Sequence, residues 1–141
     1  MTFTTTQIQD LLNSKNSDAR YYGYLYGYDY SGAVVDSDKF VRSLAANQGF
    51  GHDVLHKDPE WNVRMVVAMN GSYLNVLKDD EDEDVRVAVA TQRYALNQLI
   101  NDKSERVRAT VAQMGFGLHI LKDDESETVR TAVDKYFASN F

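Results

Sequence analysis

The sequence predicts an all-α protein built as an α-solenoid, because the chain repeats itself every 22 residues. Six of its eight arginines keep this period: Arg20, Arg42, Arg64, Arg86, Arg108 and Arg130. Five aspartates keep it too, each six residues before an arginine: Asp36, Asp58, Asp80, Asp102 and Asp124. A fixed period of this length indicates stacked units, each of which buries its apolar face against its neighbours.

A single repeat shows which elements to expect. Apolar residues within Val85–Ala90 recur at helical spacing, so this segment predicts an α-helix with one buried stripe. The acidic residues before it supply an N-cap and suit the helix dipole. Leucines three residues apart, such as Leu96 and Leu99, indicate a second, shorter helix that is partly 3-10. A glycine that ends the longer helix in the left-handed conformation recurs as Gly49, Gly71 and Gly115.

The in-phase arginines and aspartates predict a ladder along the stack. A planar guanidinium can bridge two neighbouring acceptors, so an arginine early in one helix can bond an aspartate in a turn between repeats. The predicted ladder contains Arg42, Arg64, Arg86, Arg108 and Arg130, with Asp58, Asp80, Asp102 and Asp124. We interpret it as structural rather than as a polyanion site, because every one of these arginines has an in-phase aspartate.

The segment Val85–Arg108 resembles the leucine-rich repeat variant family. It reads Val-Arg-x-Ala-Val-Ala, followed by two leucines, an aspartate and the next Val-Arg pair. It is also similar to short HEAT-type repeats. The resemblance covers residues 41–133 well and 7–40 weakly, and it implies alternating α- and 3-10 helices in a right-handed superhelix. Some family members carry a cysteine-bound iron–sulfur cluster, which we do not expect here because the chain has no cysteine.

The expected organisation is one solenoid of about five to six repeats. We expect a single domain over residues 1–141, with atypical, tyrosine-rich capping repeats at 1–40, regular repeats at 41–128 and a capping helix at 129–141. Tyr136 and Phe137 are expected to close the core at the C-terminal end.

Tyr21–Tyr30 contains six tyrosines in ten residues. Their rings can cap the first leucine layer or form an exposed interface, and both roles can hold for different rings. The alternation along this segment suits a strand, while the nearby glycines allow a loop or a distorted helix. Trp61 interrupts the repeat beside Pro59 and is either an exposed anchor or packed on a neighbouring turn.

Positions that break the repeat are free to carry specificity. Near the ends of the longer helices they are Asn47, Gln48, Met69, Asn70, Gln92, Arg93, Gln113 and Met114. As partner-binding residues we select tyrosines of the capping segment, the tryptophan and acidic residues of the turns: Tyr21, Tyr24, Tyr26, Tyr28, Trp61, Asp79, Asp82, Glu83, Asp123 and Glu125. The acidic runs are interpreted first as solvated helix starts and second as a surface for a basic partner.

Composition narrows the function classes. The net charge of −6 argues against a nucleic-acid or membrane-surface binder, since both need a basic footprint. No apolar run approaches the roughly 18–20 residues that span a bilayer, and the N-terminus lacks the pattern of a secretory signal. A cytoplasmic protein therefore fits best. His52 and His56 are interpreted as a surface pair, and we expect no metal site, cofactor or catalytic group.

The predicted function is a non-enzymatic module that binds another protein, and a partner with a basic surface is one option. An alternative is a small acidic inhibitor that imitates nucleic acid and blocks a basic nucleic-acid-binding protein. A second, weaker alternative is a nucleic-acid enzyme with a HEAT-like fold. The acidic, capped chain is expected to be a monomer.

Overall fold

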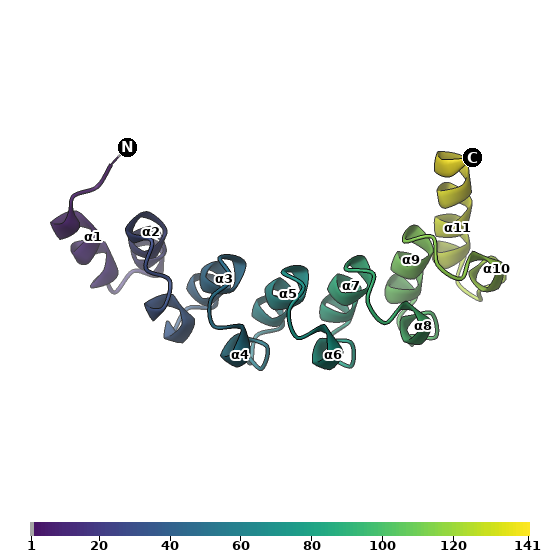
Figure 1. The fold of residues 1–141 in the computed structure, drawn as a ribbon, viewed down its shortest axis with the longest axis horizontal. Helices are drawn as coiled ribbons and strands as arrows, with labels where there is room; N and C mark the ends of the chain where they lie inside the picture. Colours follow the sequence, from purple (N-terminus) through teal and green to yellow (C-terminus); the bar gives the residue numbers. More distant parts are fainter. Residues whose placement is uncertain (1) are drawn as a thin grey trace. The chain divides into compact units, whose positions relative to one another are not determined.

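The computed structural model describes residues 2–141, which form eleven α-helices, one 3-10 helix and no strand. Figure 1 shows the order of these helices along the chain. The predicted all-α class is therefore confirmed. The chain divides into two compact units, Met1–Asn70 and Gly71–Phe141, and each unit is described by itself. No helix among residues 2–141 combines the length and the apolar character needed to cross a bilayer.

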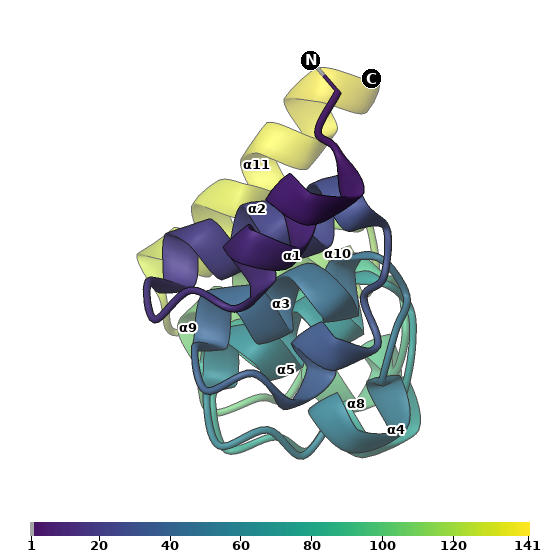
Figure 2. The ribbon, with the colours of Figure 1, turned by 90° about the vertical axis from the view of Figure 1, so that its left-hand side faces the viewer.

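The first unit begins with two helices that depart from the regular repeat. Helix α1 packs on α2, and α2 packs in turn on α3, which also contacts the 3-10 helix η1 and α5 (Figure 2). The elements are α1 (Thr5–Leu12), α2 (Ser17–Gly27), η1 (Gly32–Val35), α3 (Lys39–Asn47), α4 (His52–Leu55) and α5 (Trp61–Met69).

The second unit follows the predicted alternation closely. Four-residue helices alternate with longer helices, which have nine residues in α7 and α9 and 14 in α11. The neighbouring long helices pack on one another, α7 on α9 and α9 on α11. The elements are α6 (Leu74–Leu77), α7 (Glu83–Thr91), α8 (Leu96–Leu99), α9 (Glu105–Gln113), α10 (Leu118–Leu121) and α11 (Glu127–Asn140). The short elements are α-helical rather than 3-10.

Side-chain caps fix where the long helices begin. The Asp82 side chain accepts a hydrogen bond from the amide of Asp84 at the start of α7. Asp38 does the same for α3, accepting from Phe40 and Val41. These caps satisfy amides that have no partner inside the helix, and a carboxylate there also suits the helix dipole.

Left-handed residues end the long helices. Gly115 follows the C-cap of α9 with φ 74°, as the recurring glycine predicts. At the same place after α7, Arg93 adopts φ 58°, a conformation that is strained for a residue with a Cβ atom. The turn therefore keeps its geometry even where the sequence lacks glycine.

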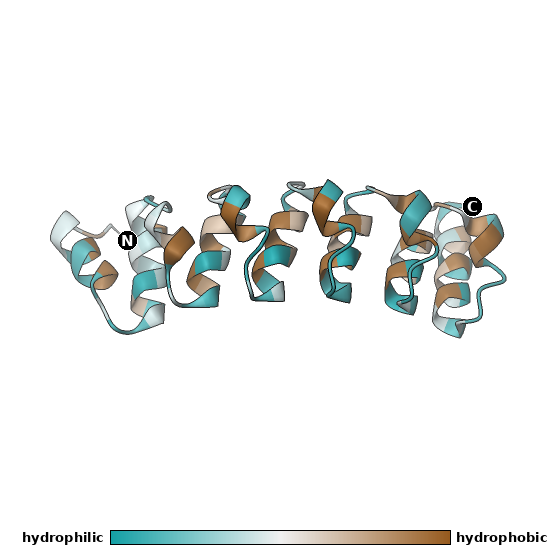
Figure 3. Cartoon of the chain, turned by 90° about the horizontal axis from the view of Figure 1, so that it is seen from below, coloured by the Kyte–Doolittle hydropathy of each residue, from teal (hydrophilic) through white to brown (hydrophobic). Residues whose placement is uncertain are grey.

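The core of each unit lies between its long and short helices. One leucine of each short helix is at most 1% exposed, and the valines that follow the helix starts are fully buried. Hydrophobic residues recur on both kinds of helix (Figure 3). The in-phase apolar positions of the sequence are thus the packing positions: Leu55, Leu77, Leu99, Leu121, Val41, Val63, Val85, Val107 and Val129.

Two expectations about individual residues are wrong. Phe137, which was expected to close the core, is 46% exposed near the C-terminal end of α11. His56 is buried rather than on the surface. Its Nδ1 lies 2.9 Å from the carbonyl oxygen of His52, and the Nε2 of His52 lies 2.8 Å from that of Ala46. Both rings therefore contact backbone carbonyls.

Candidate protein-binding surface

Arg86 shows how a ladder arginine is held in the second unit. Its Nη1 donates to the carbonyl oxygens of Asp80 at 2.7 Å and Glu81 at 3.2 Å, in the turn before its own helix. Its Nε and Nη2 donate to the two carboxylate oxygens of Asp102, at 2.8 and 3.0 Å. One guanidinium thus joins two successive turns, and Arg108 repeats the arrangement with the carboxylate of Asp124.

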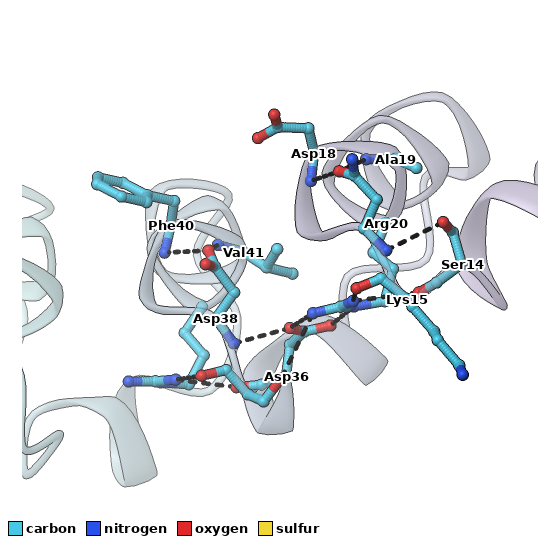
Figure 4. A network of polar contacts seen from close by, with 12 residues as sticks. Ser14, Lys15, Asp18, Ala19, Arg20, Asp36, Asp38, Phe40 and Val41 are labelled. Carbon is cyan, nitrogen blue, oxygen red and sulfur yellow. Dashed lines mark hydrogen bonds and ion pairs between the residues drawn. The ribbon is translucent and has the colours of Figure 1, made fainter.

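The first unit contains the same arrangement, drawn in Figure 4 for Arg20. Arg20 donates to both carboxylate oxygens of Asp36 at 2.8 Å and to the carbonyl oxygens of Ser14 and Lys15. The same carboxylate accepts the amide of Asp38 at 2.9 Å. Asp36 therefore fixes both the arginine and the turn that leads into α3.

The remaining ladder residues show the register of the pairing. Arg42 holds Asp58 at 2.7 and 3.0 Å, again sixteen residues further along the chain. Arg64 donates to the carbonyl oxygen of Asp58 at 2.7 Å, and Arg130 to that of Asp124 at 2.6 Å. An arginine thus bonds the backbone carbonyl of the aspartate six residues before it. The carboxylate that an arginine bonds belongs to the aspartate of the following repeat.

Charge pairing sets the protonation of these groups. Hydrogen bonds from Arg20 hold the pKa of Asp36 below its ordinary value, and those from Arg108 lower the pKa of Asp124 in the same way. The carboxylate of Asp102 raises the pKa of Arg86. Asp36, Asp124 and Arg86 are therefore ionised near neutral pH.

Shallow grooves run between successive turns of the second unit. One, of about 330 Å³, is lined by Lys78, Asp79, Glu81, Arg86 and Lys103, among others. The next, of about 520 Å³, is lined by Ile100, Arg108, Ile120, Asp123 and Glu125, among others. The selected acidic residues Asp79, Asp123 and Glu125 are exposed here, with basic side chains beside them. These grooves are consequently mixed in charge rather than uniformly acidic.

Two other selected acidic residues are engaged within the unit. Asp82 caps α7. Glu83 is bonded by the hydroxyl of Ser104 and by Arg106, whose Nη1 lies 3.0 Å away, and these bonds lower the pKa of Glu83. Arg106 also contacts Asp84 at 2.7 Å. The start of α7 therefore presents a paired network rather than free carboxylates.

The tyrosines of the first unit divide between packing and exposure. Tyr30 is buried, with its ring centroid 5.4 Å from that of Phe50. Tyr22 and Tyr26, one turn apart on α2, are exposed and stack at 6.1 Å. Tyr28 is 78% exposed. Because α2 is helical as far as Gly27, the strand interpretation of this segment is wrong. Two selected tyrosines, Tyr21 and Tyr24, are half-buried.

Helix α5 carries an apolar stripe that is partly exposed to solvent. Trp61, Met65 and Met69 follow one another at the helical spacing of four residues. Trp61 is 40% exposed, Met69 is 56% exposed and Met65 is half-buried. In α2 these positions are Ser17, Tyr21 and Leu25. In α3, α7, α9 and α11 they are mostly polar or small and begin with a charged residue: Lys39, Ser43, Asn47; Glu83, Val87, Thr91; Glu105, Ala109, Gln113; Glu127, Thr131, Lys135.

The same positions line an open surface in the second unit. A groove of about 340 Å³ between α9 and α11 is lined by Ala109, Gln113, Thr131 and Lys135 from the stripe positions. Thr128 lines it as well. The stripe positions and the position of Thr128 therefore belong to one solvent-facing side of these long helices.

The counterparts of Thr128 in the first unit are Asp18 on α2, Phe40 on α3 and Asn62 on α5, and of these Phe40 is apolar. Phe40 is 62% exposed, and the Nζ of Lys39 lies 5.6 Å from its ring centroid. Helix α3 packs on α5, the helix that carries the stripe. We call Phe40, Trp61, Met65 and Met69 the α3–α5 face. Sequence reasoning selected Trp61 and marked Met69; aligning the repeat would also have shown Phe40 and Met65.

Among residues 2–141, no group of three histidine, aspartate or glutamate side chains is arranged to hold a metal ion. Comparison of the chain with protein families, with curated proteins and with solved structures finds no match. The surface is therefore interpreted from its own geometry.

Proposed function

We propose that this chain is a non-enzymatic protein-binding module, a right-handed α-solenoid of HEAT-like repeats of the leucine-rich repeat variant type. In each unit a long and a short helix recur every 22 residues, which supports a solenoid. The ladder contacts between successive turns support it as well. The partner would be another protein, bound through the solenoid surface.

The observation that carries the proposal is the α3–α5 face. The in-phase valines at the helix starts and the leucines of the short helices are buried, whereas this face exposes a tryptophan, a methionine and a phenylalanine at positions that are polar in α7, α9 and α11. Tryptophan is enriched among residues that dominate binding energy, and methionine adapts to irregular partner surfaces. A contiguous exposed apolar stripe such as that of Trp61, Met65 and Met69 is a feature that marks contact sites for other proteins.

The acidic-inhibitor alternative receives less support. Imitating nucleic acid requires free carboxylates, but the ladder aspartates Asp36, Asp58, Asp102 and Asp124 are each bonded by an arginine. Glu83 and Asp84 are both bonded by Arg106. The carboxylates that stay exposed, such as Asp79 and Glu125, lie beside basic side chains.

The test is a pull-down of the tagged protein, residues 1–141, from its host lysate, followed by affinity measurement with the partner found. Trp61→Ala should weaken binding at least about 30-fold, as for a hot-spot residue, while binding persists at high salt. Glu127→Ala, at the same position of α11, is the matched control and should bind normally. Thermal melts must show that both variants fold. A partner released by salt or DNA and insensitive to Trp61→Ala would favour the acidic inhibitor instead.

A further inference from the structure

Helices α3 and α5 each bury one polar side-chain atom without a hydrogen bond. Among residues 2–141, neither the Oγ of Ser43 on α3 nor the Oδ1 of Asn62 on α5 has a partner. Buried polar groups in folded proteins are nearly always bonded, and an unpaired one is destabilising. By contrast, Thr110 and Asn70 each donate to the carbonyl oxygen four residues before them. The two unpaired atoms are therefore exceptions, and a bound partner would satisfy them.

The repeat aligns both residues with a groove of the second unit. The groove of about 340 Å³ between α9 and α11 is lined by Ala109 and Thr128, among others. Ser43 stands at the repeat position of Ala109, and Asn62 stands at that of Thr128. Since α3 packs on α5 as α9 packs on α11, the equivalent positions border the same kind of groove. They are Ser43, Asn47, Trp61, Asn62, Met65 and Met69.

The groove between α3 and α5 is lined by uncharged residues. The groove between α9 and α11 includes Glu127 and Lys135. At these positions α5 carries Trp61 and Met69, which are 40% and 56% exposed. Arg64, the charged residue of α5, is buried and bonded to backbone carbonyls. A charged occupant would bury its charge here without a partner, which is unfavourable. The lining therefore suits an uncharged and partly apolar occupant.

The unpaired atoms distinguish an extended occupant from a helical one. The backbone of a helix is bonded within the helix, so a helical partner would leave Ser43 and Asn62 unpaired. An extended segment has free backbone groups: an N–H can donate to the Oδ1 of Asn62, and a C=O can accept from the hydroxyl of Ser43. We propose that the groove between α3 and α5 binds an extended, uncharged segment of a partner protein. This inference rests on the proposed function, because Trp61, Met65 and Met69 belong to the α3–α5 face.

The dimensions of the groove suit a short segment. The stripe from Trp61 to Met69 is about 12 Å long at the rise of an α-helix, and about four extended residues cover that length. Side chains of an extended segment alternate, so every second one can contact the stripe while the backbone faces the hydrogen-bonding groups. Methionine side chains are unbranched and flexible, so Met65 and Met69 can move aside and uncover the two buried atoms.

The experiment uses a phage library of random linear heptapeptides, selected on the immobilised protein, residues 1–141, and counter-selected on Trp61→Ala. The enriched peptides should be uncharged and carry apolar residues at alternate positions. The best of them is synthesised, and calorimetry gives its Kd. Asn62→Leu and Ser43→Ala should each weaken binding about three- to ten-fold, the effect of one hydrogen bond. Thr128→Leu, at the position of Asn62 in α11, is the matched control and should bind normally.

Two further measurements separate binding from folding. Methylation of one backbone nitrogen of the peptide should weaken binding to the parent about as much as Asn62→Leu does. Because Asn62→Leu and Ser43→Ala remove unpaired buried atoms, thermal melts should show a Tm equal to or above that of the parent. Lower Tm values for both variants would overturn the proposal, since the two side chains would then serve the fold.

Three outcomes of the selection would also overturn the proposal. They are enriched peptides with apolar residues at helical spacing, binding that neither Asn62→Leu nor Ser43→Ala weakens, and the absence of any peptide that depends on Trp61. The proposed function is judged separately with the partner found in the pull-down. If Trp61→Ala releases that partner while Asn62→Leu and Ser43→Ala retain it, the protein-binding function holds and the extended occupant is wrong.

Discussion

Replacing Arg86 by alanine removes four hydrogen bonds and leaves the carboxylate of Asp102 without its cation. The side chains of Arg86 and Asp102 are only 6% and 8% exposed. Breaking a buried ion pair by removing one partner costs about 3–5 kcal/mol, because the remaining charge is left unpaired in a poorly solvated place. Asp102 keeps the amide of Ser104 at 2.8 Å and borders a groove, so we expect the lower end, about 3 kcal/mol.

The assay is chemical denaturation of Arg86→Ala followed by circular dichroism, supported by thermal melts. A loss of about 3 kcal/mol corresponds to a decrease of roughly 10 °C in Tm for a chain of this size. Arg106→Ala is the matched control, because Arg106 also bonds two carboxylate oxygens but its side chain is 53% exposed. An exposed pair contributes at most about 1 kcal/mol, so this variant should be nearly as stable as the parent.

The double variant Arg86→Ala with Asp102→Asn separates the pair from other effects. It should be less destabilised than the sum of the single variants, with a coupling energy of about 1–3 kcal/mol, since the second change removes the unpaired charge. If Arg86→Ala costs no more than Arg106→Ala, or if the two single changes are additive, the ladder does not stabilise the stack and this reasoning fails.

Two further predictions concern acid sensitivity and turn geometry. The folded-state pKa values of Asp36 and Asp124 lie below the ordinary value of 3.8, so their stabilisation is present above that pH and is lost as the pH falls through the folded-state values. Urea unfolding at decreasing pH should show this loss below about pH 4, and Asp124→Asn should lessen it; a flat profile would contradict it. Gly117→Ala should lower the free energy of unfolding by about 1–3 kcal/mol. Residue 117 has φ 62°, and the new Cβ atom would collide with the side chain of Ile100. Gly49→Ala, with φ 86° and open space, should cost less in the same denaturation assay.

The period of the sequence was sufficient to predict the helices but not the register of the ladder. A residue that repeats every 22 positions stands both six residues after one aspartate and sixteen before the next, so the two pairings are indistinguishable in the sequence. Geometry decides between them. The guanidinium of Arg86 bonds only the backbone carbonyl of Asp80, whereas its Nη2 atom donates to the carboxylate of Asp102. The period alone therefore shows which arginines and aspartates belong to the ladder, but it does not show which carboxylate each arginine bonds.

In the tyrosine-rich segment, the period of the sequence differs from the period of the element that forms. Its alternation has the period of a strand, yet the segment as far as Gly27 belongs to helix α2, whose start is capped by Asn16, accepting the amides of Asp18 and Ala19. The helical phase then separates rings that look alike in the sequence, so Tyr22 and Tyr26 meet on one exposed side. Neither the cap nor the phase follows from composition, and the division between packing and exposed rings could only be read from the structure.

The repetition itself makes the α3–α5 face interpretable, because each long helix serves as a control for the others. Packing cannot require an apolar residue at the Trp61 position, since Lys39 and Glu105 occupy it in α3 and α9. The stacking contacts, by contrast, use residue types that recur at every turn, such as the buried valines. Folding does not depend on the residue type at a position that is charged in some repeats and aromatic in another. An exposed tryptophan at such a position is therefore explained by a role other than folding. Exchanging the α5 stripe residues for those of α9 should consequently leave stability nearly unchanged and abolish partner binding.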